Sequence, residues 1–316
     1  MTALSRLGLG AWAFGGVGWG PQDDRDSIAT IYRAVELGVD WIDTAAVYGG
    51  GHSETVVGMA LANLPEAERP LVFTKAGMRI DPVSGATYRD LSPNSLRADC
   101  DASLRRLRVE RIDLYQLHWP VEDHEIVEQA WHTLGELHHE GKIRWSGVSN
   151  FDTPLLERCV GIRAIDSVQL PLSLLNHQEA EDILPWAAAH SVPALVYSPL
   201  ESGLLSGQFS LKRLAALTAD DWRQQRPQFQ MPRVERSLRL VELLRPVADD
   251  LGASLAELAI AWTLQWPAVI GAIVGARSPK QIDDWIGAKN LVLADSTLGQ
   301  IDALLNEAGT ERGASP

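Results

Sequence analysis

The sequence predicts an α/β protein, a (β/α)8 TIM barrel, and two observations carry that prediction. Eight short apolar runs of strand length are spread along the chain, and helical patterns separate them. Strands buried on both faces that alternate with helices are typical of parallel α/β folds. Eight is the number of strands that closes such a barrel, although a doubly wound sheet could use as many.

The predicted strands are, in order, residues 6–12 (RLGLGAW), 40–44 (DWIDT), 70–75 (PLVFTK), 113–118 (DLYQLH), 143–149 (IRWSGVS), 166–170 (DSVQL), 193–198 (PALVYS) and 269–275 (VIGAIVG). Between them, apolar residues recur every three or four positions, for example in 96–107, 127–134 and 238–251, which predicts helices with one buried face. No linker or shift in composition divides the chain, so we expect one domain over residues 1–316.

Two stretches interrupt this regular alternation. Residues 13–24 follow the first predicted strand, and residues from about 199 to 232 follow the seventh. Both leave the carboxyl end of a strand, which is the face of a barrel where active sites assemble. We therefore expect these two stretches to act as lids or binding loops.

Composition excludes several classes of function. The net charge of −13, without a visible basic patch, makes nucleic acid and anionic membranes poor partners. The two cysteines, Cys100 and Cys159, form no CxxC pair, which argues against a disulfide framework and fits a reducing cytoplasm. No signal peptide or membrane span is expected from the sequence. The sequence gives no indication of the oligomeric state.

Three other kinds of chemistry find no support in the sequence. Gly8, Gly10 and Ala13 fit a loose dinucleotide-binding pattern, but the glycine-rich segment that follows cannot form the helix that this motif needs. His138 and His139 are adjacent and point in different directions on a helix, so no metal site is expected. The G-x-S-x-G motif of serine hydrolases does not occur.

Four proton-carrying residues lie at the carboxyl ends of three consecutive predicted strands. Asp43 ends the second strand and Tyr48 lies in the loop beyond it, Lys75 ends the third strand, and His118 ends the fourth. The carboxyl ends of neighbouring parallel strands lie side by side, so these four side chains can converge on one site.

The residue types suggest distinct roles in catalysis. The phenol of Tyr48 is a proton donor whose pKa, ordinarily about 10, we expect Lys75 to lower, while Asp43 holds Lys75 in place. His118 can orient a substrate oxygen through a hydrogen bond. The glycines after Tyr48 allow the loop to carry the phenol to the mouth of the barrel.

At these positions the chain resembles the aldo-keto reductases. The matching segments, in the order of that family, are DTAAVYGGGHSETVVG from Asp43, the lysine of VFTK, LYQLHWP, GKIRWSGVSNF, QLPLSLLN, YSPLESGLLSG and VGARSPKQI. They cover nearly the whole chain. The pair GVSNF and YSPLESGLLSG resembles the bacterial and potassium-channel-β-like branch most.

The resemblance implies an oxidoreductase with an NADPH (NADP+) cofactor that reduces aldehyde and ketone carbonyls to alcohols. It places the catalytic tetrad on Asp43, Tyr48, Lys75 and His118. The implied cofactor contacts are Trp12, Asp43, Ser149, Asn150, Gln169, Tyr197, Ser198, Pro199, Leu200, Gly203, Leu204, Gly275, Ala276, Arg277 and Gln281, with Tyr197 stacked on the nicotinamide and Arg277 at the 2′-phosphate. The implied substrate contacts are Trp19, Tyr48, His118 and Trp119.

Two positions depart from the family pattern. Gln208 stands where a cation often contacts phosphate, and Trp285 stands where an asparagine often contacts adenine. Two other functions stay open at this point: a regulatory module that keeps the cofactor site, and an aldolase that forms a Schiff base on Lys75.

Overall fold

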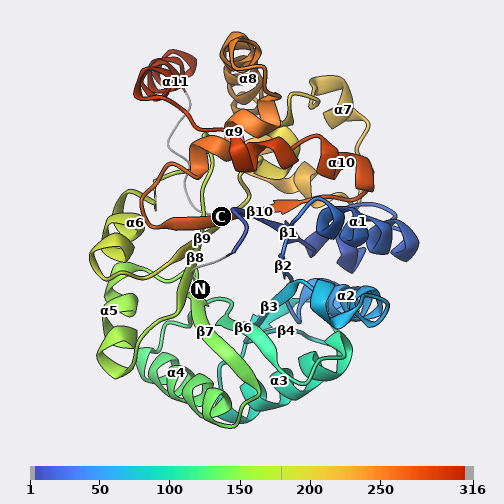
Figure 1. Ribbon diagram of the computed structural model, residues 1–316, viewed down its shortest axis with the longest axis vertical. Helices are drawn as coiled ribbons and strands as arrows, with labels where there is room; N and C mark the ends of the chain where they lie inside the picture. The colour runs from blue at the N-terminus through green and yellow to red at the C-terminus, as the bar shows by residue number, and fades with distance from the viewer. Residues whose placement is uncertain (1–3, 179, 310–316) are drawn as a thin grey trace.

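A computed structural model describes residues 4–178 and 180–309, and in it eight parallel strands close into a barrel (Figure 1). Around the barrel the strands follow the order β1, β10, β9, β8, β7, β6, β3 and β2. Their bounds are β1 Leu7–Gly10, β2 Trp41–Asp43, β3 Leu71–Ala76, β6 Ile112–Leu117, β7 Ile143–Ser149, β8 Ser167–Pro171, β9 Ala194–Tyr197 and β10 Val269–Gly275. Each predicted strand overlaps one of them, and the predicted (β/α)8 fold is confirmed.

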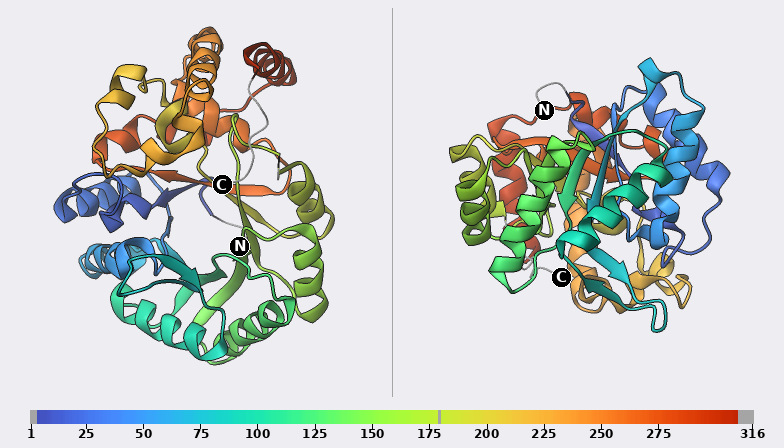
Figure 2. Two further views of the ribbon diagram at one scale, coloured as in Figure 1. Left: turned by 180° about the vertical axis from the view of Figure 1, so that it is seen from behind. Right: turned by 90° about the horizontal axis from the view of Figure 1, so that it is seen from below.

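Helices surround the barrel on its outer side (Figures 1 and 2). Their bounds are α1 Asp24–Glu36, α2 His52–Ala62, α3 Pro93–Leu107, α4 His124–His139, α5 Thr153–Ile162, α6 Ala180–Ala189, α7 Leu211–Ala215, α8 Arg233–Asp250, α9 Leu255–Thr263, α10 Pro279–Asp283 and α11 Asp295–Ala308. Several begin at a side-chain cap, such as Asp123 before α4 and the capping box of Ser254 and Glu257 at α9. None of the described helices is long and apolar enough to cross a membrane.

Large side chains fill the inside of the barrel near the start of the strands. Trp41 of β2 stacks on Phe73 of β3 with ring centroids 5.1 Å apart, and both are fully buried. A Cβ atom at Gly8 would lie only 2.4 Å from the Trp41 ring, so glycine is required there to make room for the indole. The interior is therefore packed at this end, and the cavity of the protein lies at the other.

Two additions extend the barrel at the carboxyl ends of its strands. A hairpin of β4 (Met78–Ile80) and β5 (Thr87–Arg89) follows β3, and the segment after β9 contains the 3-10 turns η4 (Glu201–Ser206), η5 (Trp222–Gln225) and η6 (Pro227–Phe229). Both project from the same end of the molecule (Figure 2, right). The hairpin was not predicted, because its strands are three residues long, largely exposed and without an apolar run.

Candidate active site

The four residues of the predicted tetrad converge at the carboxyl ends of β2, β3 and β6. Asp43 is the last residue of β2, Lys75 lies in β3, His118 directly follows β6, and Tyr48 opens the 3-10 turn η2 (Tyr48–Gly51). These three strands are neighbours in the barrel. The phenol ring of Tyr48 meets the imidazole ring of His118 edge-on, with centroids 5.8 Å apart.

Lys75 and Asp43 form a buried ion pair behind Tyr48. The Lys75 ammonium donates to Asp43 Oδ1 and, at 3.0 Å, to the carbonyl oxygen of Thr44, and it lies 5.5 Å from the centre of the Tyr48 ring. Gln169 Nε2 donates to the other carboxylate oxygen of Asp43 at 3.0 Å. Asp43 therefore has both oxygens occupied, which fixes the position of Lys75.

The expectation that Lys75 lowers the pKa of Tyr48 is wrong for this structure. Burial raises the pKa of the Tyr48 phenol well above its usual value, and the negative charge of Asp43 raises it further. The Lys75 charge, which is paired with Asp43, does not reverse this rise in the free protein. Tyr48 is thus a neutral phenol at physiological pH and has a proton to donate.

The imidazole of His118 is also neutral. Burial lowers the pKa of His118 well below its usual value, and the charge of Lys75 acts in the same direction. Its Nδ1 atom is buried and has no hydrogen-bond partner among the described residues. A neutral imidazole beside a neutral phenol can hydrogen-bond an uncharged carbonyl oxygen without placing a formal charge next to it.

The glycines after Tyr48 bring its loop into close contact with the loop after β1. Gly49 has φ +61°, and a Cβ atom there would lie 2.2 Å from the carbonyl oxygen of Gly15. A side chain at residue 49 would therefore both strain the backbone and separate the two loops. This contact holds Tyr48 at the mouth of the barrel.

A single cavity of about 1100 Å³ contains nearly all of the predicted site. Every residue expected from the resemblance to contact cofactor or substrate lines it except Leu204, a fully buried residue of η4. Of the tetrad, Asp43, Tyr48 and His118 line the cavity, and Lys75 lies behind them. The volume is in the range of sites that enclose a large ligand.

Polar groups from β7 and β9 form one wall of this cavity. Asn150 Nδ2 donates to the His118 carbonyl oxygen at 2.9 Å and to Ser149 Oγ at 3.0 Å, and its Oδ1 accepts from the Tyr197 hydroxyl at 2.7 Å. Asn150 and Ser198 both have left-handed backbones, with φ of 63° and 57°. Non-glycine residues in this conformation cluster at functional sites, where the surrounding structure holds them.

Arginines line the far end of the cavity, and only Arg277 among them was predicted from the sequence. Arg277 Nε and Nη2 donate to Gln22 Oε1 and to the Pro21 carbonyl oxygen, at 3.0 and 2.6 Å, while its backbone N–H donates to Gln281 Oε1 at 2.7 Å. Burial lowers the pKa of Arg277, and the charges of Arg223 and Arg213 lower it further. Several cations held near one another beside a cavity favour an anionic ligand.

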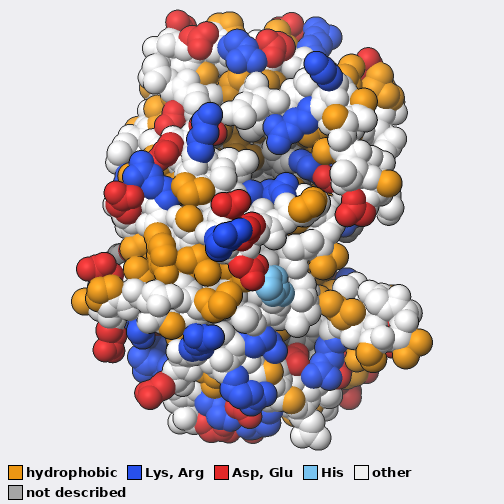
Figure 3. Space-filling view, turned by 90° about the vertical axis from the view of Figure 1, so that its right-hand side faces the viewer, with side chains coloured by type: hydrophobic (Ala, Val, Ile, Leu, Met, Phe, Trp, Pro, Cys, Tyr) orange, Lys and Arg blue, Asp and Glu red, His pale blue; other side chains and the backbone are white. Residues whose placement is uncertain are grey.

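Figure 3 shows blue side chains, those of Lys and Arg, around the hollow in the upper part of the surface. The sequence did not reveal that these cations gather at one place. The arginines that line the cavity are Arg213, Arg223, Arg226, Arg233, Arg236 and Arg277. Five of them lie between residues 213 and 236, in α7, η5, the residue after η5, and α8, and Arg277 comes from the segment after β10. A chain that is acidic overall thus brings six guanidinium groups to one cavity.

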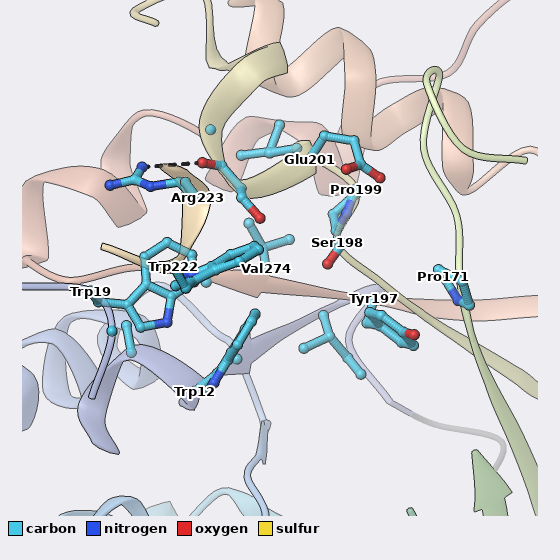
Figure 4. A pocket seen from close by; sticks show the side chains of 18 of the residues that line it. Trp12, Trp19, Pro171, Tyr197, Ser198, Pro199, Glu201, Trp222, Arg223 and Val274 are labelled. Carbon is cyan, nitrogen blue, oxygen red and sulfur yellow. Dashed lines mark hydrogen bonds between the residues drawn. The ribbon is translucent and has the colours of Figure 1, made fainter. Parts of the chain in front are cut away.

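Tryptophans form the wall on the substrate side. The ring of Trp12 lies 5.1 Å from those of both Trp19 and Trp222, and 6.1 Å from the ring of Tyr48. Figure 4 shows the three indoles together on one side of the cavity, with Tyr197 across from them. Trp222, from the segment after β9, was not predicted; its backbone N–H donates to the Gly18 carbonyl oxygen at 3.1 Å and joins that segment to the loop after β1.

The two departures from the family pattern also line the cavity. Gln208 is exposed, and its Nε2 donates to Asp284 Oδ2 at 3.4 Å. Trp285 is almost completely buried, and its indole N–H has no partner among the described residues. Neither side chain supplies a cation, so any phosphate contact at this end depends on the arginines.

The observed groups fit a nicotinamide dinucleotide. Amide and hydroxyl groups lie beside the tetrad, where a nicotinamide carboxamide would bind, and guanidinium groups lie at the other end of the same cavity, where the phosphates would bind.

Comparison with known proteins identifies the family of this chain. The model of the Aldo/keto reductase family matches residues 6–306. The chain is 35% identical to aldo-keto reductase YhdN of Bacillus subtilis over 280 residues, which cover 88% of this chain and 83% of that protein. It is 33% identical to the NADH-specific methylglyoxal reductase of Escherichia coli over 307 residues, which cover 93% and 92% of the two chains.

Two solved structures share the fold along their length. The glycerol dehydrogenase AKR11B4 from Gluconobacter oxydans superposes with a TM-score of 0.89 and 36% identity, covering 100% of this chain and 95% of that one. The holo form of aldo-keto reductase AKR11C1 from Bacillus halodurans superposes with a TM-score of 0.78 and 25% identity, covering 99% of this chain and 94% of that one. The chain belongs to the aldo/keto reductase family, whose members are oxidoreductases that act on carbonyls with nicotinamide cofactors.

Proposed function

We propose that this protein is an NADP(H)-dependent reductase that converts aldehyde and ketone carbonyls to alcohols, with Tyr48 as the proton donor. The observation that carries the proposal is the neutral phenol of Tyr48 beside the neutral imidazole of His118, at the mouth of a cavity and in front of the buried pair of Lys75 and Asp43. The free cysteines, both buried, are compatible with a reducing cytoplasm as the place of action.

A bound nicotinamide supplies the hydride that the carbonyl carbon accepts. The protein holds the carbonyl oxygen between the Tyr48 hydroxyl and the His118 ring. As negative charge develops on that oxygen, the O–H bond of Tyr48 breaks and its proton passes to the oxygen, which gives the alcohol and a phenolate. The Lys75 ammonium, 5.5 Å from the centre of the ring, stabilises the phenolate until a proton returns.

The residues that would hold the cofactor follow from the walls of the cavity. Ser149, Asn150 and Gln169 offer hydrogen bonds to a carboxamide, and the Tyr197 ring offers a flat face to the nicotinamide. Arg277 is in place to contact a 2′-phosphate: its Nη1 has no partner among the described residues. Arg213 is a second candidate and would make up for the missing cation at Gln208.

We expect NADPH to be preferred over NADH, although the relative from Escherichia coli is NADH-specific. In Arg277→Ala the NADPH Kd should rise about 10- to 100-fold, the effect of losing a hydrogen bond to a charged group, while the NADH Kd should change little. Fluorescence titration of the purified protein with each cofactor measures both constants.

The matched control for that variant is Gln22→Ala, because Arg277 also ties down the loop that carries Pro21 and Gln22. Gln22→Ala loosens this loop but keeps the guanidinium and its hydrogen bond to the Pro21 carbonyl oxygen. If both variants weaken NADPH and NADH alike, the arginine supports the loop, and the 2′-phosphate is bound elsewhere.

For the substrate, we expect uncharged aldehydes, aromatic or of medium size, to react faster than bulky anionic ones. The cavity wall beside Tyr48 is formed by Trp12, Trp19, Trp119 and Trp222, which offer apolar surface. The screen should compare kcat/KM for aldehydes of one carbon skeleton with and without a carboxylate. Faster turnover of a polyanionic member would overturn this substrate assignment.

The structure disfavours the aldolase alternative. A Schiff base requires a neutral amine that a substrate can reach, but the Lys75 side chain is 1% exposed, paired with Asp43 and absent from the cavity wall. The regulatory alternative keeps the same cofactor site, and only turnover separates it from an enzyme.

A further inference from the structure

A carboxyl group that the proposed reaction does not use lies in the wall of the cavity. Glu201 opens η4, in the segment Ser198–Leu204 that would run along the pyrophosphate of a bound cofactor, and its carboxyl group is visible above Ser198 and Pro199 in Figure 4. Glu201 is only 7% exposed. Its backbone is left-handed, with φ +43°, which non-glycine residues rarely adopt.

Glu201 has a hydrogen bond but no counter-ion. The hydroxyl of Ser173, in the loop after β8, donates to Glu201 Oε1 at 3.1 Å. That hydroxyl oxygen also accepts from the backbone N–H groups of Leu175 and Asn176, which fixes its orientation. No cation among the described residues forms an ion pair with Glu201.

The elements packed against η4 bring other charged groups to the cavity, and these do not compensate Glu201. They are Arg233 and Arg236 from α8 and Glu257 from α9, together with Arg223 from η5, which is paired with Asp221. Burial raises the pKa of Glu201 to about 7, the Ser173 hydroxyl opposes this rise, and no neighbouring charge contributes. The free protein therefore carries a mixture of neutral and ionised Glu201 near neutral pH.

We propose that Glu201 couples cofactor binding to the uptake of one proton: the cofactor binds to the protein with a neutral Glu201 carboxyl, and an ionised carboxylate at this position opposes binding. The inference rests on the proposed function, because it needs a polyanionic cofactor in this cavity. Its physical basis is the repulsion between a buried carboxylate and a pyrophosphate that share one cavity wall, where water screens charges poorly.

The direction of the pH effect follows from linkage. Below about pH 7 Glu201 is protonated in both the free protein and the complex, so its proton does not affect affinity. Above that pH the free protein loses the proton and the complex retains it, so affinity falls about tenfold per pH unit until the complex also ionises. Tyr48 and His118 do not titrate in this range, because their pKa values are displaced upward and downward.

Glu201→Gln tests the proposal, because the amide keeps the size of the side chain and still accepts from Ser173, but has no charge. The NADPH Kd should be measured by titration calorimetry between about pH 6 and about pH 9, in two buffers of different ionisation enthalpy. At about pH 8 the wild type should take up close to one proton per NADPH, and the variant none. Wild type and variant share every other titrating group, so the difference between them reports Glu201.

Ser173→Ala gives a second test that does not alter the carboxyl group. Losing the hydroxyl that favours the ionised form should raise the pKa of Glu201, so the loss of affinity should begin at a higher pH than in the wild type. This test also remains available if Glu201→Gln fails to fold.

The outcomes separate the inference from the proposed function. Proton uptake that Glu201→Gln abolishes and Ser173→Ala shifts to higher pH supports the inference. Affinity independent of pH in the wild type, or equally pH-dependent in wild type and Glu201→Gln, overturns it while leaving a cofactor-dependent reductase intact. A wild-type protein that binds NADPH at no pH overturns the proposed function itself.

Discussion

Tyr48→Phe is expected to reduce carbonyl turnover by about 10²- to 10⁴-fold, the usual worth of general acid catalysis, and to leave the NADPH Kd nearly unchanged. The substitution keeps the ring that contacts His118 and Trp12 but removes the hydroxyl that we propose as the proton donor. Rates of NADPH oxidation with a saturating aldehyde, and a fluorescence titration with NADPH, measure the two effects.

Tyr115→Phe provides a matched control. Tyr115 is a fully buried tyrosine of the neighbouring strand β6, and its hydroxyl has no hydrogen-bond partner among the described residues. Removing that hydroxyl should leave turnover unchanged and stability equal or slightly higher. If Tyr48→Phe retains most of its activity, or Tyr115→Phe loses as much, Tyr48 is not the proton donor.

Lys75→Met should also abolish most turnover, and in addition destabilise the protein. Without the ammonium, the phenolate formed by proton transfer has no nearby cation to stabilise it. Asp43 would be left as an unpaired charge that is almost completely buried, and breaking such a pair typically costs about 3–5 kcal/mol. Denaturant unfolding and NADPH oxidation measure the two consequences separately.

The double variant Asp43→Asn with Lys75→Met distinguishes the two roles. It removes both charges together, so much of the stability should return, while turnover should remain as low as in Lys75→Met. Recovery of activity along with stability would mean that Lys75 serves only to hold the fold.

Much of the fold could be predicted because its signals are local. Each barrel strand is an apolar run between helical patterns, and the eight runs correspond to the eight strands of the closed barrel. The positions of Asp43, Lys75 and His118 at strand ends followed from the same pattern, since neighbouring parallel strands end at one face. Their convergence on one cavity follows once the order of the strands around the barrel is known.

The rest of the site could not be predicted, because it depends on contacts between distant segments. Trp222 reaches the wall beside Tyr48 only because its segment pairs with Gly18, and no periodicity in the sequence indicates this. Arg213 and Arg223 join Arg277 through the packing of the segment after β9. The direction of the Tyr48 pKa shift depends on burial, which a motif does not reveal.

The proposed reductase activity is tested most directly by the reaction of the wild-type chain with NADPH and a panel of aldehydes and ketones, in which NADPH absorbance and the alcohol formed are both measured. We expect steady turnover of at least one uncharged aldehyde, with one alcohol produced for each NADPH oxidised, and the loss of both signals in Tyr48→Phe. NADPH bound without any alcohol formed across the panel, which a purely regulatory module would show, would contradict it.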